Sequence, residues 1–154
     1  MIVMAKRQKF RFLLDKSLAA AVSAIEIYNK PDFKYREETF ALLMTNAWEL
    51  LLKAKILKDN KNVLKTIYVP AKTKTKDNRN IKRFFPRTNR SGNPMTIDIF
   101  VALDRAPVDK VLKGNIESLV EIRDNAAHFA NSERLFQKKV LEVGTATLRS
   151  YVAT

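Results

Sequence analysis

Apolar residues recur at the spacing of an α-helix through most of the chain. Between Phe10 and Tyr28 they fall three or four positions apart, the period of an amphipathic helix, and Pro31 follows as a stop signal. The segment from Glu37 to Lys58 repeats the pattern over about six turns. Two long helices are therefore predicted. Their apolar positions are Phe10, Leu13, Leu14, Leu18, Ala21, Val22 and Ile25 in the first, and Phe40, Leu43, Met44, Ala47, Trp48, Leu51 and Leu52 in the second.

The helical period stops between residues 60 and 94. Two short β-favouring patches there flank a polar, basic centre, which predicts a hairpin or a disordered insertion. After it, Thr96 is expected to cap a short helix, and a longer helix is expected from about Val108 to Phe129. Asn131 and Ser132 then open a last helix. The expected inward positions are Ile116, Leu119 and Val120 in the longer helix, and Leu135, Phe136, Val140, Leu141 and Leu148 in the last.

Together these elements predict an all-α fold, an up-and-down bundle of four main helices and one short one. The basic hairpin or disordered insertion, residues 60–94, lies between helices 2 and 3. The 154 residues are expected to form one domain, because a chain of this length buries a core without staples. The final stretch, LRSYVAT, has neither a stop signal nor a polar tail, so a further C-terminal domain stays an open alternative.

Composition narrows the kinds of site that the chain can build. There is no cysteine, which excludes a disulfide framework and any Cys-ligated zinc or iron–sulfur centre. We expect no metal and no cofactor. The first residues lack the apolar core of a signal peptide, and no later apolar run is long enough to span a membrane. A cytoplasmic protein without membrane contact is expected.

The charge is strongly and locally basic. Lys and Arg number 29 against 16 Asp and Glu, a net charge of +13, which points to a polyanion such as RNA, DNA or anionic lipid. Residues 72–90 hold much of the excess, with Asp77 as the single acid and Phe84 and Phe85 interleaved, as in a nucleic-acid groove. A solvated loop is the alternative. The candidate RNA-binding residues are Lys72, Lys74, Lys76, Arg79, Lys82, Arg83, Arg87 and Arg90.

The stretch EIRDNAAHF, residues 121–129, contains the chain's one histidine, His128, five positions after Arg123. An imidazole can take the proton of an RNA 2'-hydroxyl or protonate the leaving 5'-oxygen, and a guanidinium can bind the phosphorane charge bidentately. Five helical steps separate the two side chains by about 140°, whereas Asp124 shares the face of His128 and could orient the ring. The alternative is a packed histidine and a solvated arginine.

Three stretches resemble the HEPN superfamily: AIEIYNKP (24–31), NAWELLLKAKIL (46–57) and EIRDNAAHF. The first two resemble, within it, a domain-of-unknown-function family of prokaryotic proteins grouped with abortive-infection and defence modules. The resemblance implies a helical bundle whose signature is Arg, four to six residues, then His. It identifies Arg123 and His128 as catalytic, with Asp124 where Asn is commoner and Asn125 one position later. It also implies a homodimer and a polar role for Glu49, which could instead face solvent beside Lys53.

The predicted function is a metal-independent endoribonuclease that cleaves RNA by attack of the 2'-hydroxyl. The resemblance implies a role in toxin, abortive-infection or phage-defence systems, with an antitoxin or a further domain as a possible partner. The alternative is a non-catalytic HEPN module that dimerises or docks nucleic acid or a protein. A basic helical DNA-binding domain is disfavoured, because no helix-turn-helix spacing is present.

Overall fold

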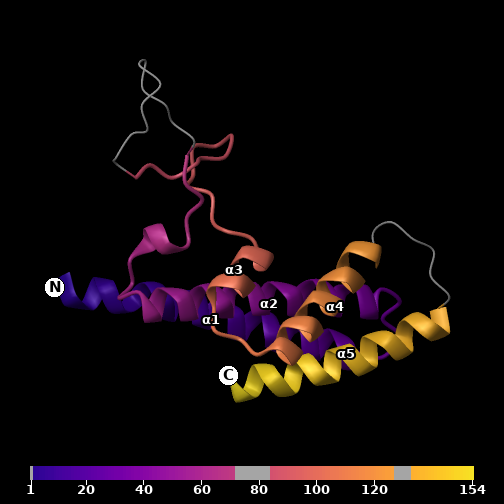
Figure 1. Cartoon of the computed structure of the whole chain (residues 1–154). Coiled ribbons are helices and arrows are strands. Elements are labelled where there is room, and N and C mark those ends of the chain that lie inside the picture. Colours follow the sequence, from indigo (N-terminus) through magenta and orange to yellow (C-terminus); the bar gives the residue numbers. More distant parts are fainter. Residues whose placement is uncertain (1, 72–83, 127–132) are drawn as a thin grey trace.

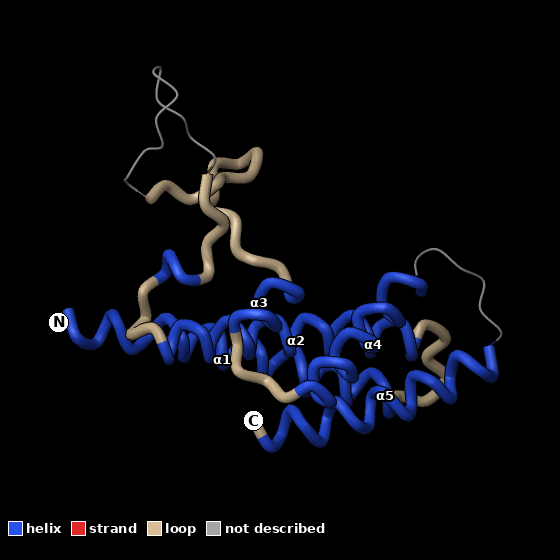
Figure 2. Tube along the Cα trace, in the orientation of Figure 1, coloured by secondary structure: helices blue, strands red, loops and turns tan. Residues whose placement is uncertain are grey.

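The computed structural model describes residues 2–71, 84–126 and 133–154. All secondary structure in this part of the chain is helical, and Figure 2 shows helices and loops without strands. The predicted all-α fold is therefore confirmed. The elements are α1 (Ile2–Asn29), α2 (Arg36–Asp59), a short 3-10 helix η1 (Leu64–Thr66), α3 (Ile99–Arg105), α4 (Lys110–Ala126) and α5 (Glu133–Ala153).

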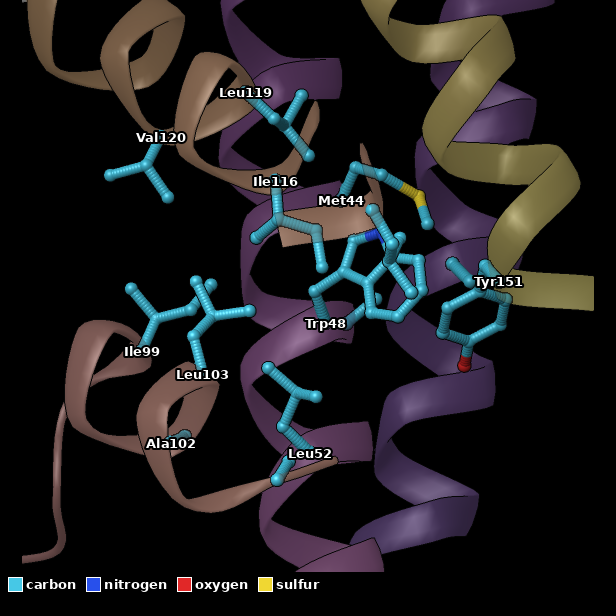
Figure 3. Packing of buried hydrophobic residues seen from close by; sticks show 14 of the residues in the cluster. Met44, Trp48, Leu52, Ile99, Ala102, Leu103, Ile116, Leu119, Val120 and Tyr151 are labelled. Carbon is cyan, nitrogen blue, oxygen red and sulfur yellow. The ribbon is translucent and has the colours of Figure 1, made fainter. Parts of the chain in front are cut away.

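Helix α2 is the centre of the bundle. It packs against α1, α3, α4, α5 and η1, and α4 packs in turn against α5 (Figure 1). Trp48 in the middle of α2 is fully buried and lies between Ile116 of α4 and Tyr151 of α5 (Figure 3). The Trp48 and Tyr151 rings meet edge to face with centroids 5.4 Å apart. Burying a side chain of this size stabilises the fold by about 2–3 kcal/mol or more.

The apolar stripe of α4 was predicted correctly, but those of α1 and α5 only in part. Ile116, Leu119 and Val120 are at most 1% exposed. On α1, by contrast, Leu18 and Val22 are 46% and 53% exposed. Helix α1 lies at the edge of the bundle, so only one of its faces is covered. The expected core positions Ile25 on α1 and Leu135 and Leu141 on α5 are likewise exposed.

The covered face of α1 includes a polar residue. Ser17 is fully buried, and its hydroxyl donates to the carbonyl oxygen of Ala47 at 2.6 Å. The same hydroxyl shares a 2.7 Å hydrogen bond with the phenol of Tyr151. Small residues on this face, Ala21 and Ala24, bring α1 close to its neighbours. Ser17 therefore joins α1, α2 and α5 at one point.

The described part of the predicted insertion, residues 60–71 and 84–94, is paired like a hairpin. Together with residues 95–97 we call it the stalk. Isolated antiparallel bridges join Tyr68 to Thr96, Pro70 to Pro86 and Thr88 to Pro94. At the middle of the stalk the backbone hydrogen bonds form a closed cycle. Val69 donates to Met95, Met95 donates to Arg87, and Arg87 donates back to Val69, at 2.9, 2.7 and 2.7 Å.

The base of the stalk is fixed to the bundle. Ile67 and Ile97 are buried in the common core. The ammonium of Lys53 on α2 donates to the Thr96 hydroxyl at 2.9 Å, and the Arg105 guanidinium donates to the Thr66 carbonyl at 2.8 Å. Thr96 is therefore not the helix cap that the sequence suggested.

The two helices that follow the stalk begin at aspartates. The Asp98 carboxylate caps α3 by accepting a hydrogen bond from the Val101 amide at 2.9 Å. Asp109 accepts from the Leu112 amide at the start of α4. A carboxylate is favoured at both positions because it also interacts with the positive end of the helix dipole. The predicted start of α5 at Asn131 and Ser132 lies outside the described residues.

Candidate functional site

Arg123 lies on the last described turn of α4. Its neighbour on the same stripe, Leu119, is buried, whereas the Arg123 side chain is 27% exposed. The guanidinium is bound to the next residue along the chain: Nε and Nη2 lie 3.0 and 2.9 Å from one carboxylate oxygen of Asp124. Two donors on one edge of the fork are thus directed at an acceptor. The same edge has the geometry that binds two oxygens of a phosphate.

Asp124 is more than half exposed, and Asn125 is half-buried. Because the Asp124 carboxylate meets Arg123 in contact with solvent, the ion pair contributes little to stability and can open at small cost. The expected role of Asp124, orienting the ring of His128, needs the same carboxylate. His128 itself lies outside the described residues. Arg123, Asp124 and Asn125 follow one another where α4 approaches that segment.

Glu49 belongs to a different cluster. Its carboxylate accepts a 2.6 Å hydrogen bond from Lys53, whose side chain is 8% exposed, and Lys53 also holds Thr96. In Figure 3, Leu119 of α4 lies toward the Met44 turn of α2, whereas Leu52 of α2 lies beside α3. Helix α4 therefore runs toward the amino end of α2. Arg123 lies one turn beyond Leu119 toward that amino end, whereas Glu49 lies on the carboxyl side of Trp48 along α2. The described contacts place Glu49 at the base of the stalk, half-buried, and not in open solvent.

Of the candidate RNA-binding residues, Arg87 and Arg90 lie on the stalk and are exposed. Phe84 and Phe85 beside them are 39% and 43% exposed. The other six, Lys72, Lys74, Lys76, Arg79, Lys82 and Arg83, lie outside the described residues. The stalk rises from the half of the bundle that holds the N-terminus, while α4 ends at the opposite half (Figure 1).

The family of the chain can be stated from a match along nearly its whole length. Residues 12–154 match the family described as Domain of unknown function (DUF3644). The chain belongs to this family. No curated protein and no solved structure matches it. The matched range contains α2, the stalk, α4 and the stretch from Arg123 to His128, so every candidate residue lies within the family domain.

The local charge of this family member differs sharply between the end of α4 and the segment that leads into the stalk. Residues 117–126, which end α4, carry one base, Arg123, and three acids, Glu117, Glu121 and Asp124. Residues 53–66, which end α2 and begin the stalk, carry five lysines and one acid, Asp59. Long-range attraction of a polyanion therefore favours the lysine-rich segment that leads into the stalk over the last ten residues of α4, where Arg123 is the one base.

Two other kinds of site receive no support within the described residues. No group of three or more His, Asp or Glu side chains there is arranged to hold a metal ion. None of the helices in this part of the chain is both long and apolar enough to cross a membrane.

Two buried polar groups were missed from the sequence. Lys53 sits four residues after Glu49, a spacing that allows an ion pair on one helix face. Ser17 interrupts the apolar stripe of the first helix at an inward position, where a hydroxyl needs a partner. Both are structural, and both signals were present in the spacing.

Proposed function

We propose that this chain is a HEPN-type, metal-independent endoribonuclease in which Arg123 and His128 act on the scissile phosphate. The observation that carries the proposal is the state of Arg123: a fork of donors, partly exposed, held at the end of α4 by a labile contact with Asp124. His128 follows five residues later in the sequence. The all-α fold and the basic stalk agree with the same proposal.

In the proposed reaction the RNA supplies its own nucleophile. His128 removes the proton of the 2'-hydroxyl, the oxygen attacks the neighbouring phosphorus, and an imidazolium of the site protonates the leaving 5'-oxygen, so that no net proton is gained or lost. The Arg123 guanidinium breaks its contact with the Asp124 carboxylate and binds two oxygens of the phosphorane, because its two parallel donors match the negative charge on those oxygens. The product strand ends in a 2',3'-cyclic phosphate, and DNA, which lacks the 2'-hydroxyl, is not cut.

One histidine and one arginine per chain make a sparse site, so we propose that two chains form it together as a symmetric homodimer. A dimer would supply two histidines, one to act as base while the other acts as acid, and two anion-binding forks. Light scattering at micromolar concentration should give twice the chain mass. A monomer under those conditions would argue against the shared site.

An antitoxin or a further domain that restrains the nuclease in toxin or phage-defence systems is part of the same proposal.

The test is cleavage of single-stranded RNA by the purified chain in EDTA. His128→Ala should lower the rate by about 100- to 10,000-fold, since a general acid or base is removed. Circular dichroism should show the helical fold of both proteins. Equal cleavage by wild type and His128→Ala would mean another site or a contaminant.

The second candidate function is a HEPN module that binds without cutting. It is favoured by one observation: Asp124 already occupies the donors of Arg123. If no RNA is cut but RNA still binds, this candidate replaces the first.

A further inference from the structure

A cavity of about 210 Å³ lies between the amino half of α1 and the carboxyl half of α2. Its apolar wall is formed by Phe10 and Leu14 of α1 and by Leu51 and Ala54 of α2. Phe10 and Leu14 are one turn apart, so they lie on the same face of their helix. The residues that line the cavity belong to the amino half of α1 and the carboxyl half of α2, which lie at the end of the bundle from which the stalk rises (Figure 1).

The edge of the cavity is charged. Lys55 and Lys58 line it, three positions apart on α2, together with the carboxylate of Asp59. In the part of the chain that the structure describes, neither lysine is paired with a carboxylate. Lys55 and Leu51 share one face of α2, so an ammonium group adjoins the apolar wall directly. Thr154, the residue after α5, also lines the cavity. The site therefore offers an apolar surface with an aromatic side chain, two cations, and hydrogen-bond acceptors at Asp59 and Thr154.

We propose that this cavity receives one unstacked base of a single-stranded nucleic acid. The ring of the base would lie against Phe10, Leu14 and Leu51, as exposed bases do on aromatic side chains. The ammonium groups of Lys55 and Lys58 then contact the phosphates on either side of that nucleotide. The Asp59 carboxylate accepts a hydrogen bond from an exocyclic amine, so adenine, cytosine and guanine bind better than uracil or thymine.

A fatty acid is the other amphiphilic anion that an apolar cavity with lysines at its edge could hold, and Asp59 disfavours it. A fatty-acid carboxylate has no donor for Asp59 and is repelled by it. A nucleotide brings donors on the base and anionic charge on the phosphate, and so matches all three kinds of group. The basic stalk end supplies the field that concentrates such a strand. The choice of nucleic acid as ligand rests on the proposed function, but base binding needs no cleavage.

The experiment is an NMR titration of the full chain with three small probes: adenosine 5'-monophosphate, ribose 5-phosphate and octanoate. The amides of residues 10–14 and 51–59 should shift with the adenosine probe at millimolar concentration. Ribose 5-phosphate should bind about fivefold or more weakly, because it has no base to stack. Absence of shifts with the adenosine probe, equal binding of ribose 5-phosphate, or tighter binding of octanoate would each overturn the proposal.

A matched pair of variants separates the cavity from general positive charge. Lys55→Ala with Lys58→Ala should weaken binding of adenosine 5'-monophosphate several-fold. Lys61→Ala with Lys65→Ala removes the same charge just beyond the cavity and should leave that binding unchanged. Equal loss in the two double variants would mean a diffuse attraction and no site. Because cleavage is absent from this assay, failure of the nuclease proposal would leave its result unaffected.

The last measurement places the base within a strand. A single 2-aminopurine in an RNA or a DNA oligonucleotide becomes more fluorescent when it leaves the stack. A rise on binding that Lys55→Ala with Lys58→Ala removes supports the proposal, and the strand that shows it identifies the source of the base. No rise with either strand would contradict base uptake.

Discussion

The two ends of the helical bundle differ in both charge and architecture. At one end, Arg123 and the acids around it lie on the surface of the last described turn of α4. At the other end, a lysine-rich segment leads into a stalk that is hydrogen-bonded to α2 and α3. Helix α2 joins the two ends, and its 24 residues span about 36 Å at about 1.5 Å per residue.

This separation indicates a division of labour under the proposed function. The lysines and arginines of the stalk and of the segment that leads into it are suited to holding a polyanion, whereas Arg123, at the other end, is suited to stabilising a reacting phosphate. A short RNA bound by the stalk of one chain does not reach Arg123 of the same chain unless it follows the length of α2. In the proposed homodimer, the stalk of one chain could instead serve the site of its partner.

The largest expected effect is on the chemistry at the end of α4. Arg123→Lys should lower the single-turnover cleavage rate by about 100-fold, because an ammonium keeps the charge and loses the planar fork. Affinity for RNA should change little. Arg149→Lys on α5 is the control, since it makes the same exchange at an exposed position with no part in the proposed site and should not slow cleavage. If the affinity for RNA fell as much as the cleavage rate, Arg123 would contribute to binding as well as to chemistry, and the proposed division between the two ends would be wrong.

The next largest effect concerns packing near the α4 end. A Cβ at position 144 of α5 would lie 2.7 Å from Cε1 of Phe40, so Gly144→Ala should lower the free energy of unfolding by about 1–2 kcal/mol. Gly114→Ala on α4 is the matched control, because nothing lies within 4 Å of its added Cβ. It should gain about 0.5–1 kcal/mol from helix propensity. Urea denaturation measures both, and equal signs would refute the packing argument.

A smaller effect is expected at the stalk. Arg87→Ala with Arg90→Ala should weaken RNA binding several-fold and reduce the slope of log affinity against log salt by about 1–2, as two phosphate contacts are lost. Lys138→Ala with Lys139→Ala on α5 removes the same charge away from the stalk and should have less effect. Fluorescence anisotropy at several salt concentrations gives the slopes. Identical slopes in the two double variants would show that the ends do not differ in affinity.

The smallest effect is a pH dependence of stability. Burial raises the pKa of Tyr151 above its ordinary value of 10.0, while the hydrogen bond with Ser17 acts in the opposite direction. The unfolded phenol therefore loses its proton first. The contribution of Tyr151 is complete below about pH 10 and is lost as the pH rises further. Tyr151→Phe should flatten that loss in urea denaturation, and Tyr35→Phe, at an exposed position, should not.

The sequence predicted the helices well because their burial follows the helical period. Met44, Trp48 and Leu52 on α2, and Ile116 and Leu119 on α4, follow that spacing and are fully buried. The period alone does not tell which face of an edge helix is covered, so Leu18 and Val22 were misjudged. The sequence predicts Thr96 as a cap because threonine suits that position. Its hydroxyl instead accepts a hydrogen bond from Lys53, which is 43 residues away along the chain.

The candidate site was predictable as a set of residues and not as an arrangement. The spacing of Arg123, Asp124 and His128 is present in the sequence. The contact between Arg123 and Asp124 depends on side-chain rotamers at the end of α4, and the pairing of Glu49 with Lys53 depends on the stalk that packs beside them. The spacing allows both contacts but fixes neither.

Backbone hydrogen bonds form a cycle through Val69, Met95 and Arg87, so the three segments of the stalk around these residues, which we call its arms, depend on one another. Withdrawal of any one arm removes two of the three bonds of the cycle and two of the three bonds that flank it, so the remaining pair keeps one of each kind. The stalk should consequently open as a single cooperative unit, and the three amides should exchange their hydrogens with solvent at one common rate. Whatever the stalk binds through one arm would slow exchange in all three.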